Sequence, residues 1–246
     1  MSEPIWNKFM TERDKEFFAQ KGFGAYAGWG KRPALLIIDV NYAFCGDKRE
    51  PIMDSVKRWP TSCGEDAWDA LPVLARVIDA ARVQGVPVIY TTGIGRDDKW
   101  DSGSWGWKNS RTNERPVVRE TNQSGNEIMP QIAPGPQDIV VPKQKPSGFH
   151  GTNLLSYLTL LGCDSVIVGG TTTSGCVRGT VIDSFSYNLR TAVIEDGCFD
   201  RSQMSHAVNL FDMHAKYADV VTSDAAIEFL RSLPKGMYEL PSGMAR

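Results

Sequence analysis

The chain has 246 residues, 41% of them hydrophobic, and a formal net charge of −2 at pH 7. This length is ordinary for a single α/β domain and is enough to bury a core without disulfide staples. The near-neutral charge gives no general attraction for nucleic acid. No apolar run approaches the roughly 18 residues of a membrane span, and the N-terminus lacks the apolar core of a signal peptide. We therefore expect neither a nucleic-acid partner nor a membrane partner.

The cysteines and histidines do not form a metal-binding pattern. The five cysteines have no paired spacing and no Cys-x-x-Cys motif, and they are Cys45, Cys63, Cys163, Cys176 and Cys198. The three histidines are His150, His206 and His214, none with a zinc-type or triad spacing. We expect no metal and no cofactor. Free thiols are typical of a reducing compartment, so we expect a cytoplasmic protein.

Short apolar segments alternate with amphipathic segments along most of the chain. The expected strands are residues 34–40, 86–92, 139–142, 165–168, 190–194 and 219–222. The expected helices are residues 68–84, 153–161, 177–187 and 203–216. The first of these helices ends before Gly85, and glycine commonly follows a helix. The alternation predicts an α/β fold with three layers, α/β/α, around a mostly parallel central sheet.

The alternation also suggests how the chain is divided. Residues 31–235 are expected to form the α/β domain, and residues 236–246 a C-terminal tail. Residues 1–30 lie outside the alternation and are expected to be an N-terminal arm, either mobile or packed on another subunit. The segment from Gly93 to Gln137 is too long for an ordinary connection and holds three tryptophans. It is expected to be a lid, a subunit contact, or a loop whose aromatic side chains anchor it on its own domain.

The most informative stretch runs from Val166 to Arg178 and reads Val-Ile-Val-Gly-Gly-Thr-Thr-Thr-Ser-Gly-Cys-Val-Arg. It predicts a buried strand, a loop of small residues, and a helix that begins near Cys176. The N-terminus of a helix carries unpaired N–H groups and partial positive charge, which lowers the pKa of a thiol placed there. The same N–H groups can hold an oxyanion. Alternatively, Cys176 is a core cysteine beside a glycine-rich loop.

Two charged residues follow other predicted strands. Asp39 comes near the end of the apolar strand 34–40, and Lys143 follows the strand 139–142. Each one alone is commonly a solvated charge at a strand end. The carboxyl ends of parallel strands meet at one edge of a sheet, where ligands bind in such folds. Together with Cys176, these residues suggest a nucleophile, a base and a cationic clamp.

Several segments together resemble the isochorismatase-like cysteine hydrolase superfamily, and within it the N-carbamoylsarcosine amidase group. The matching segments are residues 33–39, 85–92, 143–154, 169–178 and 209–219. The resemblance extends over roughly residues 22 to 234 and implies the isochorismatase-like hydrolase fold for the domain. The combination of Asp39, the Lys-x-x-x-Ser-x-Phe spacing and the Gly-Cys-Val motif is specific for the superfamily, and much less so for any one substrate.

The resemblance implies a role for each matching residue. Cys176 is the nucleophile, Asp39 the general base and Lys143 the third catalytic residue. Lys145 is a competing lysine, but the spacing to Ser147 and Phe149 favours Lys143. A cis peptide is implied between Thr171 and Thr172. The oxyanion hole would then consist of the N–H groups of Thr172 and Cys176.

The implied activity is hydrolysis of the terminal C–N bond of a small ureido, carbamoyl or amide substrate, with ammonia released through a covalent acyl-enzyme. Arg201 matches the position that binds a substrate carboxylate, although it could instead pair with Asp200 or Asp196. Thr173 and Phe44 are further candidates for contacts with the substrate. A homodimer or homotetramer is also implied.

Other substrates and another class of function stay open. The alternatives are an amidase acting on maleamate, ureidoacrylate, biuret or guanylurea, a γ-lactamase, and a nicotinamidase. Nicotinamidase is less favoured because no histidine precedes His150, so its metal site has no counterpart. The alternative outside enzymology is a binding or scaffold subunit on the same fold.

Overall fold

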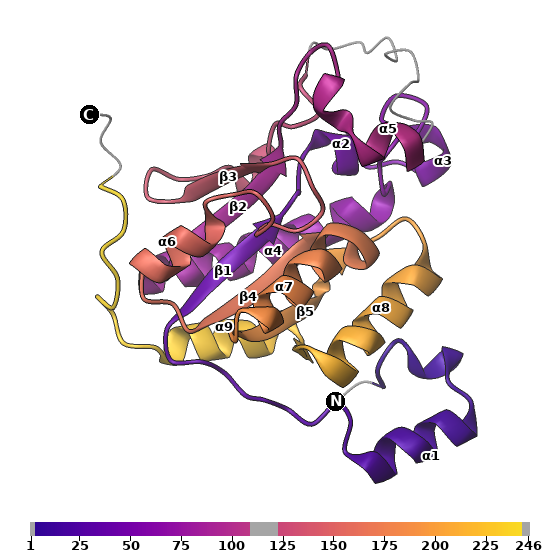
Figure 1. Cartoon of the computed structure of the whole chain (residues 1–246), viewed down its shortest axis with the longest axis vertical. Helices are drawn as coiled ribbons and strands as arrows, with labels where there is room; N and C mark the ends of the chain where they lie inside the picture. The colour runs from indigo at the N-terminus through magenta and orange to yellow at the C-terminus, as the bar shows by residue number, and fades with distance from the viewer. Residues whose placement is uncertain (1–2, 109–122, 243–246) are drawn as a thin grey trace.

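The computed structural model describes residues 3–108 and 123–242 (Figure 1). In these residues, parallel strands form one six-stranded sheet in the order β3-β2-β1-β4-β5-β6. The strands are β1 (Pro33–Ile38), β2 (Val88–Gly93), β3 (Ile139–Lys143), β4 (Ser165–Thr171), β5 (Arg190–Phe199) and β6 (Asp219–Val221). The predicted α/β fold with a parallel central sheet is confirmed.

Helices cover both faces of the sheet (Figure 1). One face carries α4 (Glu65–Gln84) and α9 (Ser223–Ser232), and the other carries α6 (Leu154–Leu160), α7 (Arg178–Ser186) and α8 (Gln203–Lys216). Side chains of β1 alternate between the two cores: Leu35 and Ile37 join the first, and Leu36 and Ile38 the second. Every residue of β1 is buried, as expected for a central strand covered on both sides.

The elements differ from the prediction mainly where the sequence is rich in glycine and polar residues. β4 continues to Thr171 and β5 to Phe199, beyond the expected ends at residues 168 and 194. The ladder between them is irregular after Val168 and then resumes, so alternation of side chains does not reveal it. α9 was not predicted, and three short helices form where no helix was predicted: α2 (Tyr42–Cys45), α3 (Ile52–Ser55) and α5 (Ser104–Lys108).

The N-terminal arm folds back on its own chain. It contains α1 (Glu12–Lys21), and the ring centroid of Phe18 lies 4.8 Å from that of Phe211 on α8. The N–H groups of Ala27 and Gly28 donate to the Asp219 carboxylate at 2.9 and 2.8 Å. From the sequence, this arm was expected to be mobile or to pack on another subunit. Packing on its own chain was not expected.

The segment from Gly93 to Gln137 is anchored near the end of β3. Trp105 Nε1 donates to the carbonyl of Gln144 at 3.0 Å, and the Gln144 side chain donates to Asp101 at 2.6 Å. The contact of Trp105 fits the third alternative given by the sequence, a loop whose aromatic side chains anchor it on its own domain. Trp100 and Trp107 are 83% and 84% exposed. Residues 109–122 of this segment lie outside the described residues, as do residues 1–2 of the arm and 243–246 of the tail.

The order of the strands defines one special edge of the sheet. The chain builds β1, β2 and β3 in one direction and then returns to place β4 on the other side of β1. At such a reversal the carboxyl ends of the strands form a crevice where ligands bind. β1 ends directly before Asp39 and β4 directly before Thr172. Across residues 3–108 and 123–242, every helix is too short or too polar to traverse a lipid bilayer.

Gly170 allows the close approach of β4 to β1 at this edge. Its φ is +113°, and a Cβ placed on it would lie 2.2 Å from the carbonyl oxygen of Ile38. Gly85 also has a positive φ of +71°, but no atom lies within 4 Å of its hypothetical Cβ.

We expect Gly170→Ala to lower the free energy of unfolding by about 3 kcal/mol or more, because it combines an unfavourable φ with a steric overlap. Gly85→Ala should lower it by only about 1–2 kcal/mol, since it adds the unfavourable φ alone. Urea unfolding of both variants tests the difference. Equal losses would show that the contact between Gly170 and Ile38 is not restrictive.

Candidate active site

Asp39 follows β1 in a left-handed backbone conformation, with φ +53°. Such a conformation is uncommon outside glycine, asparagine and aspartate. The backbone N–H donates to the carbonyl of Thr91 on β2 at 3.2 Å. The Thr91 hydroxyl donates to Asp39 Oδ1 at 2.8 Å. Asp39 is therefore held on one oxygen, and Oδ2 is left for other partners.

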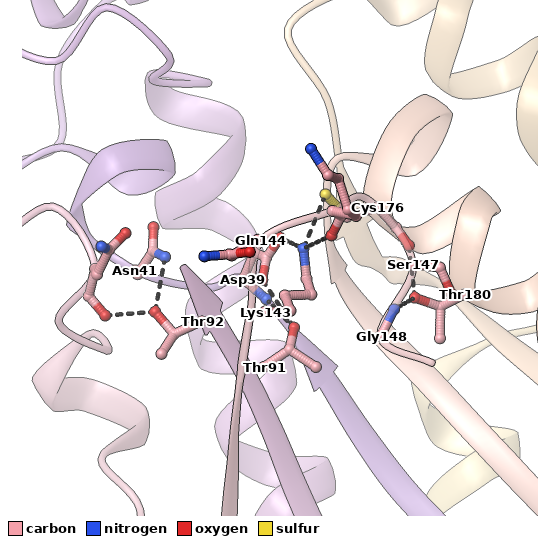
Figure 2. A network of polar contacts seen from close by, with 12 residues as sticks. Asp39, Asn41, Thr91, Thr92, Lys143, Gln144, Ser147, Gly148, Cys176 and Thr180 are labelled. Carbon is pink, nitrogen blue, oxygen red and sulfur yellow. Dashed lines mark hydrogen bonds and ion pairs between the residues drawn. The ribbon is translucent and has the colours of Figure 1, made fainter. Parts of the chain in front are cut away.

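Lys143, the last residue of β3, lies between Asp39 and Cys176 (Figure 2). Its Nζ is 2.7 Å from Asp39 Oδ2 and 3.3 Å from Cys176 Sγ, and it donates to the carbonyl of Lys145 at 3.0 Å. An ammonium has three protons, and each has a partner here. Burial alone would lower the pKa of Lys143, but Asp39 and Cys176 together hold it above its ordinary value. The lysine is charged.

Lys145, the competing lysine, contributes only its backbone carbonyl to this cluster. Its Nζ lies near Gly103, 3.3 Å from where a Cβ on that glycine would be. The geometry therefore joins Lys143, and not Lys145, to Asp39 and Cys176.

Cys176 lies in a single wide turn, Thr173–Val177, with π-helical spacing, which continues directly into α7. We call residues 172–176 the nucleophile turn. The peptide between Thr171 and Thr172 is cis, as the family resemblance implied. A Cβ on Gly175 would lie 2.6 Å from Thr172 Oγ1. The nucleophile turn therefore has space only for glycine at this position.

The low pKa expected for Cys176 is wrong. Cys176 is only 9% exposed, and burial together with the Asp39 carboxylate raises the pKa of its thiol to about 12. The Lys143 ammonium acts in the opposite direction but does not compensate. The thiol is therefore protonated at neutral pH, and a nucleophilic role for it would require a base that takes up its proton.

The loop after Lys143 is tied to the backbone of Cys176 (Figure 2). The N–H of Gly148 donates to the Thr180 hydroxyl at 2.9 Å, and that hydroxyl donates to the carbonyl of Cys176 at 2.7 Å. Ser147 Oγ accepts the N–H of Phe149 at 3.1 Å, which shapes the loop itself. These contacts explain the Lys-x-x-x-Ser-x-Phe spacing, because the motif connects the lysine to the nucleophile turn.

Arg201 lies just beyond the carboxyl end of β5 and is half-buried. Its Nη1 donates to the carbonyl of Thr61 at 2.8 Å, and its backbone N–H donates to Asp200 Oδ1 at 2.8 Å. Within the described residues, its guanidinium forms no ion pair with Asp200 or Asp196. The structure therefore does not show the alternative role of Arg201, a salt bridge to one of these two aspartates.

The other two candidates for substrate contact are held by protein partners. The Thr173 hydroxyl is 2.7 Å from Nδ1 of His206 on α8, and both residues are buried. Burial lowers the pKa of His206. Phe44 lies on α2, where it is half-buried against the core under α4, and its carbonyl accepts the N–H of Cys63 at 2.8 Å.

Sequence reasoning missed Thr91, which donates to the Asp39 side chain, and Thr180, which donates to the carbonyl of Cys176. It considered Asp200 only as an ion-pair partner of Arg201, and not as the acceptor of Ser174. Thr91 and Thr180 have no distinctive spacing, although Thr91 lies near the end of a strand expected at the same edge as Asp39. In the part of the chain that the structure describes, no three His, Cys, Asp or Glu side chains gather as a metal-binding group.

Comparisons with known proteins place this chain in a family. A family model described as the isochorismatase domain matches residues 33–225. An N-carbamoylsarcosine amidase from Arthrobacter sp is 31% identical over 237 residues, which cover 95% of this chain and 84% of the relative. A maleamate amidohydrolase from Pseudomonas putida is 30% identical over 215 residues, covering 86% of this chain and 92% of the relative.

Solved structures give the same picture. An N-carbamoylsarcosine amidase from Thermoplasma acidophilum superposes with a TM-score of 0.60 at 26% identity, covering 78% of this chain and 98% of that one. A cysteine hydrolase from Pseudomonas syringae pv. phaseolicola superposes with a TM-score of 0.72 at 21% identity, covering 85% and 97%, which shows the shared fold. The resemblance seen in the sequence is confirmed, and this chain belongs to the family of isochorismatase-like hydrolases.

Proposed function

We propose that this protein is a cysteine-dependent amidohydrolase that cleaves the terminal C–N bond of a small ureido, carbamoyl or amide substrate and releases ammonia. The observation that carries the proposal is the buried contact of Lys143 with both Asp39 and Cys176. It brings a carboxylate, a cation and a thiol together at the carboxyl edge of the sheet. The names of the curated relatives, an amidase and an amidohydrolase, support amide chemistry.

In the first step, Asp39 takes the proton of the Cys176 thiol while Sγ attacks the carbonyl carbon. The raised pKa of the thiol means that thiolate is not present beforehand, so deprotonation and attack are coupled. Lys143 stays protonated and compensates the negative charge as it moves from the Asp39 carboxylate to sulfur and then to the carbonyl oxygen. The N–H groups of Thr172 and Cys176 are the proposed donors to that oxyanion.

In the second step, the protonated Asp39 gives its proton to the leaving nitrogen, and ammonia departs from the tetrahedral intermediate. The product is a thioester, or a thiocarbamate if the substrate is a ureide. A water molecule then transfers a proton to Asp39 and attacks the acyl carbon. The C–S bond breaks, and the proton returns to sulfur, so that the free enzyme is restored without any other reactant.

The substrate that the chain fits best carries a carboxylate next to the amide or ureide group. Within residues 3–108 and 123–242, the Arg201 guanidinium makes one hydrogen bond, from Nη1 to the carbonyl of Thr61, which leaves further donors for an anion. N-carbamoylsarcosine and maleamate both carry a carboxylate. We therefore propose an N-carbamoylsarcosine-like substrate, with maleamate or ureidoacrylate as the nearest alternatives.

We expect Cys176→Ala to reduce ammonia release by about a thousandfold or more, since the covalent route is lost. The assay is a panel of N-carbamoylsarcosine, maleamate, ureidoacrylate, biuret and nicotinamide, with thermal unfolding as the folding control. A folded Cys176→Ala protein with nearly normal turnover would rule out the cysteine mechanism.

A second prediction separates the base from the cation through the pKa of Cys176. Asp39→Asn removes a negative charge beside sulfur, so the pKa of the thiol should fall and alkylation by iodoacetamide at pH 8 should become faster. Lys143→Met removes the cation, so the pKa should rise further and alkylation should slow. Both variants should nevertheless lose turnover. Mass spectrometry of the Cys176 peptide over a pH series measures the alkylation rates.

Lys145→Met is the matched control for these two variants, because its side chain lies outside the cluster. It should leave the alkylation rate of Cys176 close to that of the wild type. Slower alkylation in Asp39→Asn, or full turnover in that variant, would contradict the role of Asp39 as the base.

A third prediction concerns the charge of the substrate. Arg201→Ala should lower kcat/KM for N-carbamoylsarcosine about ten- to hundredfold, the effect of losing a hydrogen bond to a charged group. It should change the much slower hydrolysis of N,N-dimethylurea little, since this analogue lacks the carboxylate. Equal losses on both compounds would assign Arg201 a structural role.

A further inference from the structure

Asp200 is a buried acid placed directly after β5 and is 4% exposed. In the described part of the chain its carboxylate has no ion-pair partner, and it accepts three hydrogen bonds. Asp200 Oδ2 accepts from the N–H and the hydroxyl of Ser174 at 2.8 and 2.7 Å, and Oδ1 accepts from the N–H of Arg201 at 2.8 Å. Burying a carboxylate is unfavourable unless such donors stabilise it, so each of these bonds constrains its donor strongly.

The two residues that donate these bonds belong to two parts of the proposed site, the nucleophile turn and the region that binds the substrate carboxylate. Ser174 lies within the nucleophile turn, two residues before Cys176. Arg201 is the proposed holder of the substrate carboxylate, and its guanidinium is also bound to the carbonyl of Thr61. One carboxylate therefore connects the turn that carries the nucleophile to the backbone of the arginine that binds the other end of the substrate.

We propose that Asp200 is a positioning residue that fixes Arg201 relative to the nucleophile turn and thereby selects substrates by the spacing between their carboxylate and their scissile carbonyl. This inference rests on the proposed function. A small shift between the group that binds a substrate and the group that attacks it strongly reduces the rate, because the reacting atoms must be held in near-attack geometry. Since Asp200 binds both segments through separate oxygens, its loss affects both kcat and KM.

The opposite side of the turn has its own restraint. The Thr173 hydroxyl contacts His206, and the carbonyl of Cys176 accepts from Thr180. Neither contact involves Arg201. Asp200 alone among these partners touches both the nucleophile turn and Arg201, so the proposal assigns the coupling to it.

The chain provides a matched control on the same strand. Asp196 of β5 accepts from the N–H and the hydroxyl of Ser223 at 2.7 and 2.5 Å, at the start of α9. This is the same kind of contact between an aspartate and a serine, but on a helix that carries none of the proposed catalytic residues. Asp196→Asn therefore measures the general effect of disturbing such a contact.

The experiment compares Asp200→Asn, Ser174→Ala and Asp196→Asn in the full chain, with thermal unfolding as the folding control. Asp200→Asn should lower kcat and raise KM for N-carbamoylsarcosine, with kcat/KM reduced about ten- to hundredfold. Ser174→Ala keeps its backbone N–H, and should lower kcat about three- to tenfold without changing KM. Asp196→Asn should leave kcat and KM at wild-type values.

A double-mutant cycle tests the coupling to Arg201 directly. If Asp200 raises affinity through Arg201, adding Asp200→Asn to Arg201→Ala should not raise KM for N-carbamoylsarcosine any further. It should still lower kcat, through the nucleophile turn. Additive effects on KM, or an Asp200→Asn variant that behaves like Asp196→Asn, would overturn the proposal.

Two readouts keep this test apart from the test of the proposed function. The alkylation rate of Cys176 needs no substrate, and we expect Asp200→Asn and Ser174→Ala to change it by at least about threefold while Asp196→Asn does not. If Cys176→Ala is inactive but Asp200→Asn has wild-type kinetics and a wild-type alkylation rate, the positioning role of Asp200 is rejected and the proposed function stands. If Cys176→Ala is active, the proposed function itself is rejected. Should Asp200→Asn not fold, an unchanged kcat and alkylation rate in Ser174→Ala overturn the proposal.

Discussion

The arrangement at the carboxyl edge of the sheet depends on one buried cation. The Lys143 ammonium uses all three of its protons, on Asp39, Cys176 and the carbonyl of Lys145. Removing one partner of a buried ion pair typically costs about 3–5 kcal/mol, because the other charge is left without compensation. The same contact therefore joins the ends of β1 and β3 to the nucleophile turn, in addition to the backbone ladders of the sheet.

The electrostatics of this cluster favour a proton relay over a stored thiolate. A thiolate beside Lys143 alone would be stabilised, but the Asp39 carboxylate and burial together keep the Cys176 proton in place. The charge of the cluster then stays nearly constant during the proposed reaction, since each proton leaves one member and arrives at another. Such a site avoids both an isolated buried anion and a permanently reactive thiol.

Polar side chains from three different elements hold Asp39 and the nucleophile turn. Thr91 on β2 fixes one oxygen of Asp39, Thr180 on α7 fixes the carbonyl of Cys176, and Asp200 after β5 binds Ser174 within the nucleophile turn. These supports are short polar side chains whose own positions are set by the sheet and by the helices packed on it. Helices and strands thus surround a turn of small residues and hold it in one geometry.

The parallel α/β fold could be predicted from local patterns, because buried β-branched segments and amphipathic helices show their periodicity over a few residues. The Gly-Cys-Val motif also pointed to Cys176, and the Lys-x-x-x-Ser-x-Phe spacing favoured Lys143 without excluding Lys145. Only the tertiary structure separated Lys143 from Lys145, placed Asp200 between two segments, and showed that burial raises the pKa of Cys176. Burial and distances between separate strands are properties of the packed chain, so no local pattern encodes them.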